Sequence, residues 1–356
     1  MKDRKKKLRL LIKKNDIDGF LVVSAVNIRY LTGFKGSYGF LLLTGKDEYL
    51  FTDSRYYTEA RKLIKGTKIR LAERAWPEIL TRYGVKKLGF AENNLNFGLY
   101  RNWRRKIKGI RLIPLPDLTA EIRQVKDGQE INAIKKAVRV AQRALTGLTL
   151  RPGIEEREVK KQIEDSIREY PGAEPSFPTI VAFGGNSSMP HHHPGSNRLS
   201  GSQIVMIDLG ARLDGYSSDL TRTYLAGKIN SKFKVIYNVV LSAQKAAMEA
   251  IKPGVSIEKI DRLARDCITG NGFGRYFGHA LGHGIGMLVH EKPAINYYNK
   301  QKLLPGMVFS VEPGIYIPGW GGVRIEDLVQ VTANGCRILT DIPRELNAMI
   351  GRGRKR

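Results

Sequence analysis

The N-terminal third of the chain alternates between helical and strand-like patterns of hydrophobic residues. Apolar residues recur every three or four positions, as in amphipathic helices, in Lys5 to Asn15, Ser54 to Ile64 and Phe97 to Lys108. Short apolar runs predict buried strands at Gly19 to Ser24, Phe40 to Thr44, Tyr49 to Thr52, Lys68 to Ala72 and Lys87 to Ala91. Strands that alternate with helices predict an α/β domain.

Two prolines mark the end of this alternating region. Pro114 and Pro116 punctuate the chain, and a long helical pattern from about Gly128 to Leu148 follows them. We therefore expect an N-terminal domain of residues 1–122, a second domain of residues 123–350 and a basic tail of residues 351–356. A length of 356 residues agrees with two domains.

The second region contains an internal repeat. The segment AQRALTGLTLRPGIEEREV starts at Ala141, and the segment AQKAAMEAIKPGVSIEKI starts at Ala243. Each predicts a helix, a turn of a basic residue followed by Pro-Gly, and a second helix. Because both the helix and the turn match, the pattern indicates a duplicated α/β unit. Pockets often form between the halves of such a domain.

Two aspartates fall in a predicted hairpin of the second region. The hairpin is predicted from two apolar runs and the turn between them, Ile204 to Leu209, Asp214-Gly215 and Tyr216 to Tyr224. In this register Asp208 lies opposite Thr221 and diagonal to Asp219, which falls in the returning strand, so both carboxylates share one face. Two carboxylates so placed repel each other unless a cation lies between them. The alternative is that Asp219 caps a turn and Asp208 ends a strand.

Two glutamates are predicted to lie within apolar strands. Glu312 follows Val308-Phe309, and Glu326 has Val323, Ile325 and Leu328 as its apolar neighbours. Acidic residues inside apolar strands are costly to bury without a partner. Pairing with Arg324 could account for one of the carboxylates, but not for both glutamates and both aspartates.

All six histidines lie in two clusters, His191, His192 and His193 and then His279, His283 and His290. Histidines gathered in this way indicate a site rather than scattered structural roles. The glycines on either side of His283 lack the spacing of a dinucleotide-binding loop. We expect them to let the backbone pack closely around His283.

A pair of divalent cations would explain four carboxylates and an imidazole together. This oxygen-rich set suits manganese, cobalt or iron(II), and zinc is compatible with it. Two cations neutralise the carboxylates, polarise a carbonyl group and lower the pKa of a bound water. A single zinc ion more typically has nitrogen or sulfur ligands, and the sequence has no H-E-x-x-H motif.

The chain is strongly basic, with 60 Lys and Arg residues against 34 Asp and Glu residues and a formal net charge of +26. Such a balance raises the chance of binding nucleic acid or an acidic partner. The basic residues are spread along the chain, however, and are densest in Lys2 to Lys14, Arg101 to Arg111 and Arg352 to Arg356. Because Trp103 is the only aromatic residue within these runs, we favour a solvated basic surface over a nucleic-acid-binding protein.

The sequence predicts a soluble, cytoplasmic protein. No apolar run reaches the roughly 18 residues that a membrane-spanning helix needs. The apolar stretch Leu10-Leu11-Ile12 is too short for the core of a signal peptide. Cys267 and Cys336 form no C-x-x-C pair, so we expect no disulfide framework.

The five candidate ligands lie in motifs that resemble those of metallopeptidase family M24, which includes prolidases, Xaa-Pro aminopeptidases and methionine aminopeptidases. In chain order the motifs are IDLG with Asp208, SSDLTRT with Asp219, LGHGIG with His283, SVEPGIY with Glu312 and RIED with Glu326. The resemblance implies a duplicated α+β catalytic domain of the pita-bread fold. It also implies two bound divalent metal ions, with Mn²⁺ expected and Co²⁺, Fe²⁺ or Zn²⁺ as alternatives.

The same resemblance assigns roles to individual residues. Asp208 would chelate one metal, Asp219 and Glu326 would bridge both, and His283 and Glu312 would hold the other. Glu312 would also be the proton shuttle, His191 would contact the bound peptide, and His290 would hydrogen-bond the substrate and the tetrahedral intermediate. Arg324 is expected to orient Asp219 or a bridging carboxylate. His192, His193 and His279 receive no role.

The N-terminal segments LVVSAVNIRYLTGFKGS and YLFTDSRYYTEA resemble the creatinase-type domain of prolidases and Xaa-Pro aminopeptidases, which methionine aminopeptidases lack. The resemblance therefore implies hydrolysis of peptides with proline at the second position, by a homodimer. We expect an Xaa-Pro aminopeptidase, because the N-terminal domain is short and has no obvious insertion that would close the cleft. The alternative is an Xaa-Pro dipeptidase, a prolidase.

Overall fold

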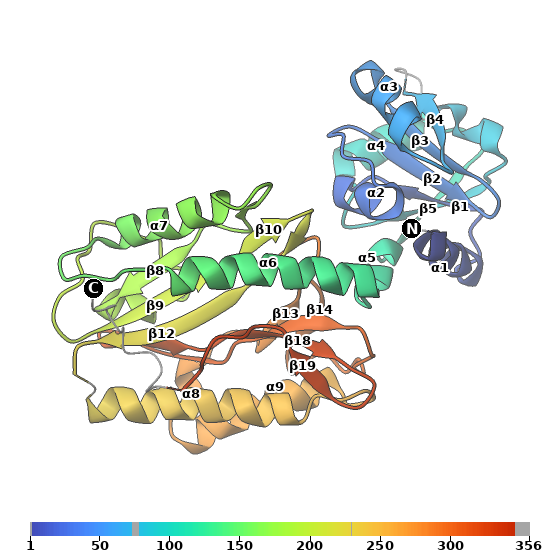
Figure 1. Cartoon of the computed structure of the whole chain (residues 1–356). Helices are drawn as coiled ribbons and strands as arrows, with labels where there is room; N and C mark the ends of the chain where they lie inside the picture. The colour runs from blue at the N-terminus through green and yellow to red at the C-terminus, as the bar shows by residue number, and fades with distance from the viewer. Residues whose placement is uncertain (1, 73–77, 229, 346–356) are drawn as a thin grey trace. The chain divides into compact units, whose positions relative to one another are not determined.

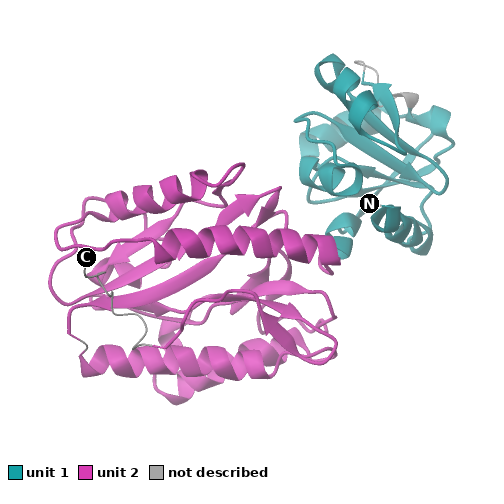
Figure 2. Ribbon diagram, viewed as in Figure 1, with its two compact units in different colours: residues 1–123 teal, residues 124–356 magenta. Residues whose placement is uncertain are grey.

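The computed structural model describes residues 2–72, 78–228 and 230–345. The chain forms two compact units, residues 1–123 and residues 124–356 (Figure 2). The basic tail that the sequence predicts at residues 351–356 lies outside the described residues. Within the described ranges, no helix has both the length and the apolar character needed to cross a bilayer.

The first unit is built on a six-stranded sheet with the strand order β4-β3-β2-β1-β5-β6. The strands are β1 (Gly19–Val22), β2 (Phe40–Thr44), β3 (Glu48–Thr52), β4 (Lys68–Leu71), β5 (Lys87–Ala91) and β6 (Arg111–Leu115). Strand β2 pairs antiparallel with β1 and β3, whereas the other neighbours are parallel. The central strands are apolar throughout because helices and loops cover both faces of the sheet, which leaves Leu41, Leu42 and Leu43 with no exposed surface.

The helices of the first unit are α1 (Lys2–Lys14), α2 (Ala25–Thr32), α3 (Ser54–Leu63), α4 (Phe97–Lys106) and α5 (Leu118–Arg123), with a 3₁₀ turn η1 (Glu78–Tyr83). Side-chain caps set two of the starts. The Asp53 carboxylate accepts a hydrogen bond from the Arg55 N–H at α3, and the Asn96 side chain accepts one from the Leu99 N–H at α4. The α/β class predicted for this domain is confirmed.

Two helix pairs form the outer layers of the second unit, α6 (Gly128–Thr146) with α7 (Glu156–Arg168) and α8 (Ser231–Glu249) with α9 (Ile257–Gly270). A capping box starts α6, in which Asp127 and Glu130 exchange side chain–backbone hydrogen bonds. In α7, Val159, Ile163 and Ile167 recur at every fourth position and are fully buried. This spacing places one apolar stripe against the sheet.

The strands of the second unit are β7 (Glu174–Pro175), β8 (Ile180–Phe183), β9 (Gln203–Leu209), β10 (Ala211–Leu213), β11 (Tyr216–Ser217), β12 (Leu220–Ala226), β13 (Gly282–Gly284), β14 (Glu291–Ile295), β15 (Val308–Val311), β16 (Gly314–Ile317), β17 (Gly321–Arg324), β18 (Asp327–Val331) and β19 (Cys336–Ile338). Short 3₁₀ turns lie at η2 (Gly184–Ser188) and η3 (Gly274–Tyr276). Two sheets matter for the site, β12-β9-β8 and β14-β13-β15-β18-β19. In Figure 1 the strands lie between the α6–α7 pair and the α8–α9 pair.

The two halves of this unit repeat the same local geometry. The Pro-Gly turn between α6 and α7 places Gly153 at φ +83°, and the turn between α8 and α9 places Gly254 at φ +84°. Only glycine adopts this left-handed conformation at little cost. Each second helix begins beside an isolated antiparallel bridge, Glu155 with Arg198 in one half and Ser256 with Lys302 in the other. The repeated turn and bridge agree with the duplicated unit that the sequence predicts.

Each half also has its own apolar core. Ala137, Ala141 and Val159 pack with Val205 and Ile207 on the α6–α7 side. On the other side, the residues of α8 and α9 pack with a second apolar set that includes Phe309, Val323, Ile325 and Val329. The carboxylates and the imidazole singled out from the sequence therefore come from strands, or from the ends of strands, that lie between two packed helix layers.

Candidate metal centre

The two aspartates come from neighbouring strands at the centre of the first half. Strands β9 and β12 pair antiparallel with Asp208 opposite Thr221, the register that the sequence predicts. Asp219, however, lies one residue before β12 and is not in a strand. The ladder is interrupted there because the Ser218 hydroxyl accepts a hydrogen bond from the Ala211 N–H and donates one to the Ala211 carbonyl. The interruption frees the Asp219 side chain from the regular alternation of a strand.

The two glutamates also lie at strand ends, which differs from their predicted position inside strands. Glu312 follows β15 directly, and Glu326 lies between β17 and β18. Their backbone N–H groups are still bonded, from Glu312 to the Leu281 carbonyl at 2.9 Å and from Glu326 to the Thr221 carbonyl at 3.1 Å. The backbone is thus satisfied without a regular ladder, and the side chains can turn towards the aspartates.

His283 lies in strand β13 and presents one ring nitrogen to the carboxylates. Its Nδ1 lies 3.2 Å from the Gly284 carbonyl, an acceptor only, so Nδ1 carries the proton and Nε2 faces the site. From Nε2 the distances are 3.3 Å to Glu312 Oε1 and 3.5 Å to Asp219 Oδ2. A Cβ at Gly282 would lie 2.0 Å from the Ser310 carbonyl oxygen, and one at Gly284 would lie 2.2 Å from that of Lys292. These glycines allow the close packing around His283 that the sequence predicts.

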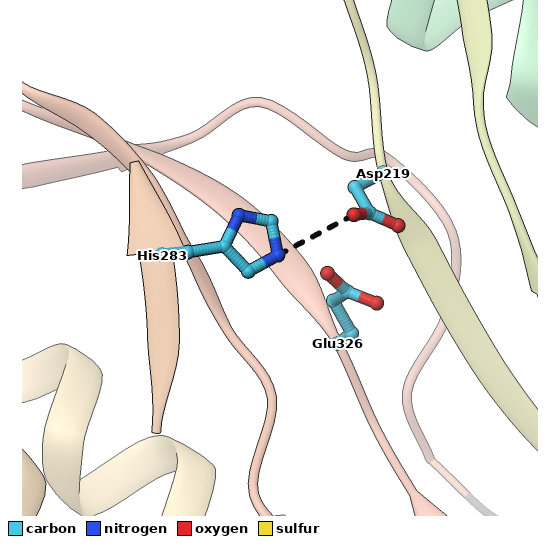
Figure 3. Close-up of side chains that lie close together, drawn as sticks. All are labelled: Asp219, His283 and Glu326. Carbon is cyan, nitrogen blue, oxygen red and sulfur yellow. Dashed lines mark ion pairs between the residues drawn. The ribbon is translucent and has the colours of Figure 1, made fainter. Parts of the chain in front are cut away.

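Asp219, His283 and Glu326 converge on one point. Each offers one ligand atom, and these atoms all lie within 4.8 Å of one another. Figure 3 shows the three side chains pointing towards one another from separate segments of the chain. An imidazole nitrogen and two carboxylate oxygens at this spacing form a set that a divalent transition metal can bind.

The carboxylates have unused oxygens that fit bound cations. Asp208 Oδ1, Asp219 Oδ1 and Glu326 Oε1 are buried and have no hydrogen-bond partner among the described residues. Burial and the mutual repulsion of these carboxylates raise the pKa of Asp219 and of Glu326 well above the usual range. Buried oxygens without partners are costly, and divalent cations would satisfy them. The residues present therefore fit the metal ions that the sequence predicts.

Arg324 hydrogen-bonds residues on one side of this carboxylate cluster. Its Nη2 donates to Asp208 Oδ2 at 2.6 Å, and its Nε donates to Thr221 Oγ1 at 3.0 Å. Thr221 Oγ1 in turn donates to Glu326 Oε2 at 2.7 Å. Arg324 therefore binds Asp208 directly and reaches Glu326 only through Thr221, and no direct bond from it to Asp219 is found in the described part of the chain. The sequence predicts that Arg324 orients Asp219 or a bridging carboxylate; its direct partner is Asp208, and its path to Glu326 runs through Thr221.

Glu312 is held as an ionised base. The Ser310 hydroxyl donates to Glu312 Oε1 at 2.9 Å and accepts from the His283 N–H at 3.0 Å. Burial alone would raise the pKa of Glu312, but the neighbouring His283, His279 and Arg324 together outweigh burial and lower the pKa to about 2. The carboxylate is therefore ionised at neutral pH, the form in which it can accept a proton.

His290 and His191 lie beside the cluster with exposed side chains. The His290 ring packs edge-on against His283, with 4.3 Å between ring centroids. Partial desolvation lowers the pKa of His290, and the neighbouring His283 and His191 lower it further. The neutral imidazole keeps one N–H to donate to a bound substrate.

Within the described residues, the other three histidines make no hydrogen bond to a candidate ligand. His192 Nε2 lies 2.8 Å from Glu156 Oε2. His279 contacts the Ala280 carbonyl through Nδ1 at 2.7 Å and Tyr316 Oη through Nε2 at 3.1 Å. His193 is exposed.

Four residues of the site environment are not predicted from the sequence, namely Glu156, Thr221, Ser310 and Tyr316. Thr221 could have been found, because the predicted register already places it opposite Asp208. Ser310 lies two residues before Glu312, on the same face of a strand. Tyr316 accepts a hydrogen bond from Arg324 Nη1 at 2.9 Å, and no pattern in the sequence indicates that contact.

Two family profiles cover most of the chain. Residues 132–333 match Metallopeptidase family M24, and residues 4–125 match the Creatinase/Prolidase N-terminal domain. Both matches agree with the resemblance found in the motifs.

Individual relatives match over nearly their whole length. The Xaa-Pro dipeptidase of Pyrococcus horikoshii is 36% identical over 351 residues, which are 97% of this chain and 99% of the relative. The solved structure of the Xaa-Pro dipeptidase from Bacillus anthracis superposes with a TM-score of 0.92 at 37% identity, over 97% of this chain and 98% of that one. The X-Pro aminopeptidase from Thermotoga maritima MSB8 has a TM-score of 0.85 at 33% identity, over 93% of this chain and 97% of that one.

Proposed function

Because the chain belongs to metallopeptidase family M24, we propose that it is an Xaa-Pro dipeptidase, which hydrolyses the peptide bond before the proline of a dipeptide. The observation that carries this proposal is the near full-length similarity to Xaa-Pro dipeptidases, at 36% identity to one relative and with a TM-score of 0.92 to another. The site supports it, since four carboxylates and one imidazole are gathered in one place.

The proposal prefers the alternative of the sequence analysis to its first expectation, an aminopeptidase. That expectation relied on the short N-terminal domain. The relative from Pyrococcus horikoshii is a dipeptidase of matching length, because the alignment covers 97% of this chain and 99% of that protein. A short N-terminal domain is therefore compatible with a dipeptidase. The likeness to the Thermotoga maritima aminopeptidase keeps the aminopeptidase as the second candidate.

The cluster would hold two divalent cations. Asp208, Asp219, His283, Glu312 and Glu326 would be their ligands, with Asp219 and Glu326 shared between the two sites. Bound cations of this kind polarise a carbonyl group and lower the pKa of a water molecule. We propose Mn²⁺ because the set is rich in oxygen, with Co²⁺, Fe²⁺ and Zn²⁺ as alternatives.

The protein side chains supply proton transfer and hydrogen bonds. Glu312 accepts the proton of the attacking water and delivers it to the proline nitrogen as the bond breaks. His290 donates its N–H to the carbonyl oxygen, where negative charge develops. His191 contacts the peptide near the scissile bond. An Xaa-Pro bond has no N–H that a general protease could bind, so the reaction needs a dedicated site.

We also propose a homodimer, as the family resemblance implies, and a cytoplasmic location, in line with the expectation from the sequence. Light scattering at micromolar protein concentration tests the first proposal, and a monomer would contradict it.

The substrate proposal is tested by offering Ala-Pro, Ala-Pro-Ala and Ala-Ala-Ala side by side with Mn²⁺. We expect the highest kcat/KM for Ala-Pro. A higher value for Ala-Pro-Ala would overturn the dipeptidase in favour of the aminopeptidase. A preference for Ala-Ala-Ala would overturn proline specificity.

A further inference from the structure

A fully buried carboxylate lies outside the metal cluster, at the start of α7. Glu156 has no exposed surface. It accepts five hydrogen bonds, from the Phe183 N–H (2.8 Å), Asn186 Nδ2 (2.9 Å), Asn197 Nδ2 (3.2 Å), His192 Nε2 (2.8 Å) and the Gly195 N–H (3.1 Å). All five donors belong to one segment, residues 183–197, which we call the histidine loop. This loop joins β8 to β9, the strand that carries Asp208.

Helix capping does not account for this arrangement. A negative charge in the first turn of a helix is favourable, but a capping carboxylate binds the free N–H groups of its own helix. Glu155 and Glu158 already exchange such bonds at the start of α7. The Glu156 side chain instead reaches both ends and the tip of the histidine loop. It therefore fixes the course of the loop rather than the start of the helix.

The surroundings of the Glu156 carboxylate favour its ionised form. Burial alone would raise the pKa of Glu156, but hydrogen bonds from His192, Asn186 and the backbone N–H groups of Phe183 and Gly195 outweigh burial and hold the pKa below its usual value. An ionised carboxylate only accepts, so the His192 Nε2 is the donor in their contact. Hydrogen bonds to a charged acceptor are stronger than those between neutral groups.

These contacts fix the backbone immediately around His191. On one side, Arg324 Nη1 lies 3.4 Å from the Pro190 carbonyl oxygen, and the same guanidinium binds Asp208. On the other side, the His192 side chain is held by Glu156. The His191 side chain stays exposed between these two anchors, near enough to His290 to affect its pKa. A side chain that is free at its tip and fixed at its base suits a group that must meet a substrate.

We propose that Glu156 and His192 are positioning residues, which hold the histidine loop so that His191 meets the scissile bond at the metal centre. The inference rests on the proposed function, because His191 matters only if a peptide is cleaved there. It assigns a role to His192, to which the family resemblance gives none. Neither residue is proposed to touch the substrate.

The test compares two neighbouring histidines and one isosteric change. Glu156→Gln keeps the shape of the side chain but turns one acceptor into a donor that faces His192 and Gly195. His192→Gln removes the other half of the pair, and His193→Gln is the matched control on an exposed side chain. We expect the first two variants to lower kcat for Ala-Pro by about 10- to 100-fold, the cost of a misplaced group, at full metal content by elemental analysis. His193→Gln should match the unmodified protein.

Repeating the comparison in the His191→Ala variant distinguishes an effect that acts through His191 from an unspecific loss of kcat. If Glu156 acts through His191, Glu156→Gln should cost less than about 2-fold in kcat when His191 is already replaced by alanine, because coupled residues are not additive. An equal loss in both backgrounds, a loss of bound metal, or an unchanged kcat would overturn the inference. Should Glu156→Gln fail to fold, His192→Gln in the same two backgrounds decides the question. Failure of the proposed function is distinct, since the unmodified protein would then leave Ala-Pro uncleaved.

Discussion

Asp219 is the side chain on which the metal centre most depends. Its carboxylate oxygen lies within 4.8 Å of a His283 nitrogen and a Glu326 oxygen, and in the proposed function it would be a ligand to both cations. Residues that merely support ligands cost 10- to 100-fold in metal affinity when they are replaced. We therefore expect Asp219→Asn to weaken metal binding by about 100-fold or more and to abolish most activity.

The measurement is metal content after dialysis, together with the rate on Ala-Pro. Asp266→Asn, an exposed aspartate on α9, is the control and should keep both properties. Full metal content in Asp219→Asn would contradict the assignment of Asp219 as a ligand.

His290 should matter for the reaction and not for folding. Its side chain is exposed and contacts the cluster only through the His283 ring. Removing a donor to a developing negative charge costs about 100-fold or more in kcat, so we expect that loss for His290→Ala. The free energy of unfolding should change by less than about 1 kcal/mol, as for a surface substitution. Rate measurements check the loss of kcat, and denaturant unfolding checks the free energy of unfolding. A fully active variant, or one that does not fold, would refute the prediction.

At the scale of elements, a buried ion pair joins strands from both halves behind the metal centre. Arg222 in β12 and Asp327 in β18 are fully buried, with Arg222 Nη2 2.7 Å from Asp327 Oδ1. Arg222 also donates to the carbonyls of Glu326 and Ile342. The pair thus fixes the backbone of one metal ligand and the C-terminal segment at the same time.

Breaking this pair should be strongly destabilising. Asp327→Asn leaves the Arg222 charge buried without its counter-ion, which costs about 3–5 kcal/mol of unfolding free energy. Glu258→Gln, which breaks the partly exposed pair between Arg262 and Glu258, is the matched control and should cost less than about 1 kcal/mol. Both are measured by urea unfolding with a chelator present, so that bound metal does not contribute. A loss below about 1 kcal/mol for Asp327→Asn would show that the pair is not a structural anchor.

Elements with a simple local pattern could be predicted from the sequence, and those defined by distant contacts could not. Strands β2 and β5 have the predicted bounds, because an uninterrupted apolar run between polar residues specifies a buried strand. Helix α1 begins three residues earlier than predicted, at Lys2, because charged residues extend its first turn without adding to the apolar stripe.

The candidate ligands were found for a related reason. Asp208, Asp219, Glu312 and Glu326 are conspicuous because acidic residues are rare among apolar neighbours. The position of Asp219, Glu312 and Glu326 at strand ends was missed, since hydrophobic periodicity continues across a short break in a ladder. The contact between Glu156 and His192 joins residues 36 positions apart, and neither has a local signal.

At the scale of the whole molecule, the metal centre belongs to only one of the two units. All five candidate ligands lie within residues 124–356, and the first unit has a separate core that contains Leu42, Phe51 and Trp103. A ligand that binds only the folded state stabilises it by about 2.7 kcal/mol at one hundred times its dissociation constant. Removing the metal should therefore destabilise the second unit selectively.

Scanning calorimetry with and without a chelator measures this effect. We expect a transition that shifts to lower temperature on chelation and returns when Mn²⁺ is restored, beside one that does not move. Equal shifts throughout the scan would contradict a metal centre confined to residues 124–356.

The duplicated halves divide the ligands unequally, and this division has a consequence for the affinity of the protein for metal. Asp208 and Asp219 precede α8, whereas His283, Glu312 and Glu326 follow it, so neither half alone carries the full coordination set. If the two halves were separate polypeptides, they would have to associate before they could bind a cation. Their apparent metal affinity would then decrease on dilution. A single covalent chain makes that encounter intramolecular, at an effective concentration in the millimolar range. Metal retention within one chain is thereby independent of how much protein the cell contains.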